Sequence, residues 1–418
     1  MAQGGRRRLR EARRNFLRGL AAVALDAAGA TPAMSAEDAS KAMVRPAQTV
    51  TLFLCGDVMT GRGIDQALPH PGDGRIHEPV MKSARGYVRL AEDAHGPIPR
   101  PVEFPYIWGD ALEELERVKP DARIVNLETA VTVHDHPWPG KGIHYRMHPA
   151  NVPCLTAAGI DCCVLANNHV LDWDRPGLEE TVEALKSAGI RAAGAGENSQ
   201  VAAAPAVLEL AGGGRVLVFS FGAGSSGIPR DWAASADRSG VNLLPELSYR
   251  TLGRVAAAIR AARRSGDIVV ASMHWGANWG YHVPGEHVAF AHGLIEEAAA
   301  DVVHGHSSHH PLGIEVHRER LILYGCGDFI NDYEGISGHE QYRPDLALGY
   351  FVELDAATGK LSGLAMAPYR MQRFRLNRAA GDDARWLRDV MEREGKNFGS
   401  SVTLDAGGRL RLAWTGLA

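Results

Sequence analysis

The sequence predicts an α/β fold, and two observations carry this prediction. Short apolar and β-branched runs alternate with longer amphipathic segments along most of the 418 residues, which is the pattern of strands connected by helices. Several of the runs end in an aspartate, a glutamate, an asparagine or a histidine. Ligands of open α/β sheets bind outside the carboxyl ends of strands, so this order predicts a functional site at one edge of a sheet.

The strands and helices follow from local patterns. Residues 49–54 form a continuous apolar and β-branched run bounded by Gly56, as expected of a buried strand. Asp172 or Asp174 is expected to cap a helix at 175–188. Further strands are predicted at 122–128, 161–165, 207–210, 215–221, 267–272, 302–303, 321–324, 349–354, 361–368 and 410–414, and further helices at 111–118, 249–264, 285–300 and 383–393.

These elements form one predicted domain, residues 49–418. Within it, residues 65–105 contain many Pro, Gly and His residues with little periodicity, which predicts a long excursion over the surface. Residues from about 360 onward are predicted to form a C-terminal extension.

The first 36 residues differ from the rest of the chain and predict an export signal. Seven arginines precede a stretch of small residues that ends in Ala-Met-Ser-Ala36, and the pair Arg13-Arg14 resembles a twin-arginine signal. Because Asp26 interrupts the apolar part, a disordered basic arm is the alternative. Export predicts a periplasmic or other extracytoplasmic protein, either free or associated with the membrane, with residues 37–48 as a linker.

Composition excludes some classes of function. Hydrophobic residues make up 45% of the chain and charged residues 22%, and no apolar run is long enough to span a membrane. The five cysteines form no C-x-x-C pair, so we expect buried thiols rather than a zinc ribbon or a disulfide framework. Without residues 1–36 the chain carries 38 basic and 47 acidic groups, a net charge of −9, which argues against sequence-independent nucleic-acid binding.

The polar residues at the predicted strand ends are of the types that bind metals. Each alone could be a helix cap, a salt-bridge partner or a buried histidine. As a set they combine hard oxygen and borderline nitrogen ligands, which suits one or two zinc, manganese or iron ions better than calcium, with a carboxylate able to bridge. The set is Asp57, Glu128, Asn168, His169, His274, His306 and His309.

The motifs around these residues resemble a known family. In order along the chain they are Gly56-Asp57, Asn126-Leu127-Glu128, Asn167-Asn168-His169, His274-Trp275-Gly276, Gly305-His306 with His309, and Gly327-Asp328-Phe329. Between about residues 50 and 335 this series resembles the CapA family, the poly-gamma-glutamate capsule synthesis proteins, which are related to calcineurin-like metallophosphoesterases. The resemblance implies a sandwich of two β-sheets flanked by helices, with two metals at the strand ends.

The resemblance also implies roles for individual residues. The metal ligands would be Asp57, Glu128, Asn168, His274, His306 and His309, with one of the two carboxylates bridging. His169 would protonate a leaving oxygen or stabilise developing charge. The chain departs from the classical phosphoesterases at Met59, where they have a histidine, and in the spacing of His306 and His309.

Two further residues are candidates for substrate binding. Arg146 lies in a basic, aromatic loop and could grip a carboxylate or phosphate, although a solvated loop is an equal alternative. Asp328 replaces the family's usual asparagine, so an extra carboxylate is expected to face the site.

The function that follows is a metal-dependent hydrolase for an anionic envelope substrate, a phosphoester or poly-gamma-glutamate, associated with capsule or polymer biosynthesis. The alternative is a non-catalytic envelope component that assists polymer assembly, export or anchoring. Other capsule or polymer synthesis proteins are the expected partners.

Overall fold

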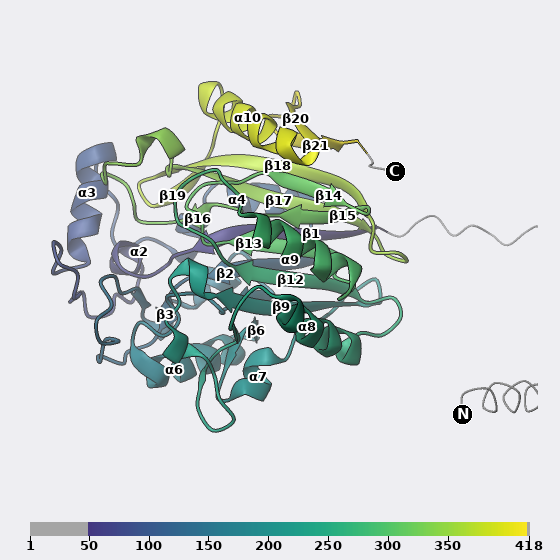
Figure 1. Ribbon diagram of the computed structural model, residues 1–418. Coiled ribbons are helices and arrows are strands. Elements are labelled where there is room, and N and C mark those ends of the chain that lie inside the picture. Colours follow the sequence, from purple (N-terminus) through teal and green to yellow (C-terminus); the bar gives the residue numbers. More distant parts are fainter. Residues whose placement is uncertain (1–48, 416–418) are drawn as a thin grey trace, which may run out of the picture. The chain divides into compact units, whose positions relative to one another are not determined.

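The computed structural model describes residues 49–415, so the predicted export signal and linker lie outside the described residues. Two β-sheets pack face to face with helices on their outer sides, which confirms the predicted sandwich (Figure 1). Within residues 49–415 no helix has the length and apolar character needed to cross a membrane.

The larger sheet is built around β1 (Thr49–Val58), a run of β-branched, aromatic and aliphatic residues. It pairs in parallel with β2 (Ala122–Leu127) and antiparallel with β17 (Leu346–Asp355). The short strand β16 (Asp328–Ile330) pairs with the carboxyl end of β1. The sheet is completed by β5 (Cys162–Val164), β6 (Arg191–Ala193), β18 (Leu361–Gln372), β19 (Arg375–Arg378), β20 (Ser400–Leu404) and β21 (Leu410–Trp414).

The smaller sheet is built around β12 (Ile268–His274). This strand lies parallel between β9 (Arg215–Ala223) and β13 (Val302–His306). The remaining strands are β8 (Ala206–Glu209), β11 (Leu243–Leu244), β15 (Arg320–Leu323) and the antiparallel edge strand β14 (Ile314–His317). Two short pairs lie apart from both sheets: β3 (Ala130–Val131) with β4 (Arg146–Met147), and β7 (Ala195–Gly196) with β10 (Gly240–Val241).

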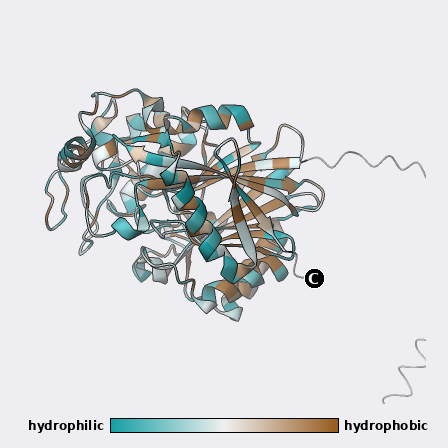
Figure 2. Ribbon diagram, turned by 90° about the horizontal axis from the view of Figure 1, so that it is seen from above, coloured by the Kyte–Doolittle hydropathy of each residue, from teal (hydrophilic) through white to brown (hydrophobic). Residues whose placement is uncertain are grey.

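The core between the sheets forms because side chains alternate along each strand. In β1, Leu52 and Leu54 join the inner core, whereas Phe53 belongs to the outer core of the same sheet. Val270 and Val302 meet the inner residues of β1 from the smaller sheet. Figure 2 shows hydrophobic residues concentrated in the strands and many hydrophilic residues on the helices.

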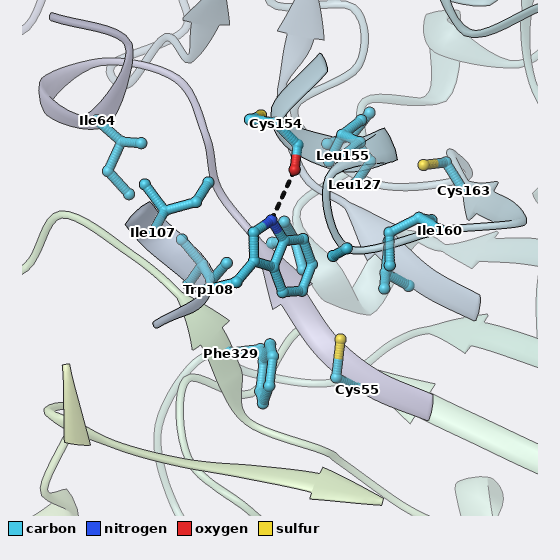
Figure 3. Packing of buried hydrophobic residues seen from close by; sticks show 14 of the residues in the cluster. Cys55, Ile64, Ile107, Trp108, Leu127, Cys154, Leu155, Ile160, Cys163 and Phe329 are labelled. Carbon is cyan, nitrogen blue, oxygen red and sulfur yellow. Dashed lines mark hydrogen bonds between the residues drawn. The ribbon is translucent and has the colours of Figure 1, made fainter. Parts of the chain in front are cut away.

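The outer core of the larger sheet is covered by several helices and loops. Trp108 is fully buried there, lies against the ring of Phe329 and donates a hydrogen bond from its indole N–H to the Cys154 carbonyl at 2.8 Å (Figure 3). All five cysteines are free and buried, as predicted.

The outer face of the smaller sheet is covered by α8 (Tyr249–Ala262) and α9 (Gly285–Glu296) (Figure 1). Phe290, Leu294 and Ile295 share one face of α9, so they pack together on the sheet. The other helices are α2 (Gly63–Ala67), α3 (Arg85–His95), α4 (Ala111–Val118), α5 (Pro153–Thr156), α6 (Asp174–Ser187), α7 (Ser199–Ala203) and α10 (Asp382–Gly395).

The structure adds detail to three expectations. The predicted excursion at 65–105 contains the helix α3. The predicted C-terminal extension is part of the larger sheet, because β18 pairs with β17 along most of its length. Of the two predicted caps of α6, Asp174 accepts a hydrogen bond from the Arg175 N–H at 2.8 Å, whereas Asp172 is used elsewhere, as described below.

Candidate metal centre

The polar residues at the strand ends gather where the two sheets face each other. Register pairs Asp57 of β1 with Asn126 of β2 and with Asp328 of β16. In the smaller sheet, His274 of β12 pairs with His306 of β13. Parallel strands bring these residues to one edge, as the sequence predicted.

Asp57 reaches the inner face because of a bulge in β1. Cys55 and Val58 both lie in the outer core, although residues three apart on a regular strand point to opposite faces. The register between β1 and β2 shifts between Cys55 and Asp57, so Gly56 is the extra residue. A Cβ on Gly56 would lie 1.8 Å from the Gly327 carbonyl oxygen, so only glycine fits.

Asp57 belongs to two groups of side chains that could each hold a metal ion. One group combines it with His274 and His306, and the other with His309 and Asp328. Within each group the ligand atoms lie within 4.8 Å of one another, and all five residues are buried. A carboxylate common to two groups is the arrangement that a bridged pair of metals requires.

The histidine side of the centre is a chain of close polar contacts. Nδ1 of His274 lies 2.7 Å from Nδ1 of His306, and Nε2 of His274 lies 3.0 Å from the Asn168 amide oxygen. Burial lowers the pKa of both histidines well below the usual value. Both rings are therefore neutral at pH 7, which is the form that binds metals.

The second side of the centre is held by amides. Nδ1 of His309 lies 2.8 Å from Asp328 Oδ1, and its Nε2 lies 2.8 Å from the Asn278 amide nitrogen. Asn331 donates to the other Asp328 oxygen at 2.9 Å. Burial opposes the charged form of His309, but Asp328 raises the pKa of this histidine above its usual value.

Negative charge is crowded at the centre. Burial, and after it the Asp328 carboxylate, raises the pKa of Asp57 to about 7. Burial and the Asp57 charge raise the pKa of Glu128 well above its usual range. Asp57 Oδ2 is buried without a hydrogen-bond partner. A cation would offset both the crowding and the unpaired oxygen, so these residues fit a bound metal.

His169 lies beside the centre and is oriented by Asp172. Its Nδ1 lies 2.6 Å from Asp172 Oδ2, and its Nε2 lies 3.7 Å from Glu128 Oε1. Lys141 places its ammonium 2.5 Å from the other oxygen of Asp172. Burial lowers the pKa of His169 to about 4, against the opposing effect of Asp172.

Comparison with known proteins places the chain in a family. A family model described as bacterial capsule synthesis protein PGA_cap matches residues 51–333. The chain belongs to the PGA_cap family. The strands β17 and β18 follow the matched residues and complete the larger sheet of this PGA_cap protein.

Individual relatives are named for polyglutamine synthesis or capsule biosynthesis. A probable polyglutamine synthesis accessory protein of Mycobacterium tuberculosis is 49% identical over 354 residues, 84% of this chain and 93% of the relative. The capsule biosynthesis protein CapA of Bacillus anthracis is 24% identical over 289 residues, 69% of this chain and 61% of that protein. Among solved structures, a phosphatase of Mycoplasma pneumoniae matches with a TM-score of 0.44 and 11% identity, over 77% of this chain and 94% of that one.

The structure of this PGA_cap protein brings the predicted ligands together. Asp57, His274, His306 and His309 fall in the two candidate metal groups. The other two predicted ligands lie beside them. Asn168 contacts His274, and Glu128 shares with Asp57 the amide nitrogen of Asn126, at 3.3 and 2.7 Å respectively.

The two predicted substrate residues are placed differently from each other. The Arg146 guanidinium donates to the carbonyl oxygens of His134 and Asp73, each at 2.8 Å, and lies over the Trp173 ring at 3.7 Å. These contacts occupy it within the protein. Asp328 does face the centre, but as a member of a candidate metal group.

Residue types alone did not reveal the supporting roles around the centre. Asn126 holds Asp57, and Asn167 in turn donates to the Asn126 amide oxygen at 3.0 Å. Asp172 orients His169 instead of capping a helix. Sequence motifs with asparagines indicate such supporting contacts, as in Asn126-Leu127-Glu128 and Asn167-Asn168-His169. The loop around Lys141 has no motif that indicates its contact with Asp172.

Proposed function

We propose that the protein is a metal-dependent hydrolase that acts on an anionic substrate in capsule or polymer biosynthesis. The observation that carries the proposal is Asp57, a buried carboxylate shared by two candidate metal groups, with the His169–Asp172 pair beside it. A purely structural polar core would satisfy its carboxylates within the protein, and Asp57 Oδ2 has no such partner.

The residues that would hold the metals follow from the two groups. His274 and His306 with Asp57 would hold one ion, His309 and Asp328 with Asp57 the other, and Glu128 and Asn168 lie in contact with these residues. A divalent metal bound there supplies Lewis acidity, which polarises a phosphoryl or carbonyl oxygen and neutralises the charge that develops on it.

His169 would donate a proton to the leaving group. Asp172 holds Nδ1 of the ring, which leaves Nε2 directed toward Glu128 and the centre. Burial disfavours the protonated ring in the free protein, and an anionic substrate beside it would favour that form. Lys141 contacts Asp172 and His169, so it fixes the pair and adds positive charge for an anion.

The substrate and surroundings are proposed from the family and from the sequence. Relatives named for capsule biosynthesis and polyglutamine synthesis support a phosphoester intermediate or a γ-linked glutamate chain as the substrate class. They also support association with other synthesis proteins. The paired arginines near the N-terminus support export and a mature chain that begins near Glu37.

A non-catalytic role is the second candidate. Two observations favour it: the Mycobacterium relative is named an accessory protein, and amides already occupy one nitrogen each of His274 and His309. In this role the centre would be a binding surface that assists polymer assembly, export or anchoring.

Metal analysis and a substrate screen separate the two candidates. Purified protein is expected to hold one or two transition-metal equivalents, and His306→Ala should lose at least one. His282→Ala, which removes an exposed histidine outside the centre, should keep them. Wild-type protein is then tested on nitrophenyl and alkyl phosphoesters and on γ-linked glutamate oligomers, with and without added metal. Metal binding without turnover on any of them would support the non-catalytic role, and unchanged metal content in His306→Ala would overturn the assigned centre.

A further inference from the structure

A second cluster of histidines and carboxylates lies on α9 and the edge strand β14. His292 and Glu296 are four residues apart on α9, so they lie on one face of the helix. Glu315 and His317 are two residues apart on β14, so they lie on one face of the strand. We propose that His292, Glu315 and His317, with Glu296 beside them, form a separate metal site for zinc or a similar divalent ion of the late first-row metals.

The ligand atoms of this cluster converge. Nε2 of His292 lies 2.9 Å and Nδ1 of His317 lies 3.9 Å from the same Glu315 oxygen. Nε2 of His317 lies 2.7 Å from Glu296 Oε1. One ligand atom each from His292, Glu315 and His317 fall within 4.8 Å of one another. Two nitrogen or oxygen ligands of a tetrahedral zinc ion lie about 3.4 Å apart, so side-chain rotations that shorten the longer of these separations would complete the site.

The surrounding contacts hold the cluster in place. The two imidazole rings stack face to face, with centroids 3.9 Å apart and planes inclined by 6°. Their nitrogen lone pairs therefore lie in parallel planes, and one ring must turn out of the stack for both to bind one ion. The buried Tyr324 hydroxyl donates to Glu315 Oε2 at 2.5 Å, which fixes this carboxylate and leaves Oε1 directed at His292. Hydrogen bonds of this kind to a metal ligand orient it and typically strengthen binding.

The cluster is open enough for an ion to enter. The side chains of His292 and Glu296 are 31% and 34% exposed, whereas Glu315 is 10% exposed. Two imidazoles and a carboxylate suit zinc better than calcium or magnesium, which prefer oxygen ligands alone. Because the ligands come from both α9 and β14, a bound ion would tie the helix to the edge of the sheet.

The test compares zinc binding with and without the two histidines, in a background that weakens the strand-end centre. Metal-free Asp57→Asn protein is titrated with zinc against a chromophoric chelator, alongside versions that also carry His292→Gln with His317→Gln. Asp57→Asn with His282→Gln is the matched control, since His282 is exposed and outside the cluster. The single His317→Gln change is included because it disturbs the fold least, and circular dichroism checks folding.

Removal of both histidines should abolish the binding of one zinc equivalent or raise its Kd by about 100-fold or more. Loss of a hydrogen-bond partner of a metal ligand weakens metal binding by up to about 100-fold, and loss of the ligand itself should have a larger effect. Zinc should also raise the Tm of Asp57→Asn and of the His282→Gln control, and raise it less without the two histidines. Equal stoichiometry, affinity and Tm shift with and without them would overturn the proposal, because the four residues would then be ordinary ion pairs.

Discussion

The strand-end centre and the α9–β14 cluster use the same kinds of side chain in opposite surroundings. At the strand ends Asp57, His274 and His306 are fully buried, and one Asp57 oxygen has no partner. On α9 and β14, each oxygen of Glu315 has a partner, and the histidines reach solvent. Charge that is buried and unpaired destabilises a fold, whereas exposed ion pairs change its stability little.

The difference implies different dependence on metal. The strand-end centre needs a cation to offset its carboxylates. Because these buried carboxylates destabilise the fold when they are unpaired, we expect them to be kept for binding an ion or a substrate or for another activity. The α9–β14 cluster is already satisfied as ion pairs, and a metal would only add to its stability. Four predictions test this contrast, beginning with the largest expected effect.

The first prediction concerns the shared carboxylate. Asp57→Asn keeps the shape of the side chain but removes the charge common to both groups, so both metal equivalents at the strand ends should be lost or weakened. Any metal-dependent turnover should fall by more than about 10²-fold. Loss of a residue that only hydrogen-bonds to a metal ligand lowers activity by up to about that factor, and loss of the ligand itself should exceed it. Metal analysis by mass spectrometry and kcat/KM measure the two effects. Full metal occupancy in Asp57→Asn would end the assignment of Asp57 as a bridge.

The second prediction separates proton handling from metal binding. His169→Gln should keep the metal and lower turnover by about 10²- to 10⁴-fold, the usual range for one general acid. The loss should shrink for nitrophenyl esters, because a good leaving group needs little protonation. Variants of the α9–β14 cluster should show the reverse pattern, with one metal lost and turnover unchanged. Equal losses on good and poor leaving groups would make His169 a positioning residue.

The third prediction concerns Lys141, which contacts Asp172 and His169 but no candidate ligand. Lys141→Met should lower kcat by about 10- to 100-fold with unchanged metal content, as expected of an outer partner. Lys141→Arg restores the charge and should recover part of the loss. An increase in KM with unchanged kcat in Lys141→Met would instead mean that the ammonium binds the substrate.

Much of the strand-end centre was predictable because the residues that form it directly follow strands that can be recognised in the sequence. Buried strands have a clear apolar signature, and the residue that follows each strand is visible in the sequence. The position of Asp57 on the inner face was not predictable, because simple alternation from Leu54 places it on the outer face. The bulge at Gly56 corrects this, and it depends on the close approach of Gly327, which is 271 residues away in the chain.

Other features were missed because they depend on tertiary contacts. The strand β14 is short, and two of its residues, Glu315 and His317, are charged or polar, so it has little apolar signature. Without this strand, His292 is one surface histidine among others. Lys141 lies in the same basic, aromatic loop as Arg146, but only the fold brings it to Asp172.

The smallest expected effect concerns His287. This residue lies on α9, as His292 does, but it is buried beside Trp275, which directly follows β12. Its ring stacks on Trp275 at 4.7 Å, and its Nε2 is buried without a partner. Burial lowers its pKa from 6.5 to about 4. Between these values the unfolded chain binds a proton that the folded chain does not, so stability is lost as pH falls from 6.5 through about 4.

His287→Phe keeps the stacking and removes this titration. At pH 8 its free energy of unfolding should be close to that of the wild type, and at pH 5 it should exceed the wild type by roughly 2 kcal/mol. Urea unfolding at the two pH values measures the difference, with His282→Phe as the control at an exposed position of the preceding loop. If the pH 8 to pH 5 loss of stability were the same in His287→Phe as in the wild type, burial of this histidine would not be what distinguishes it from His292.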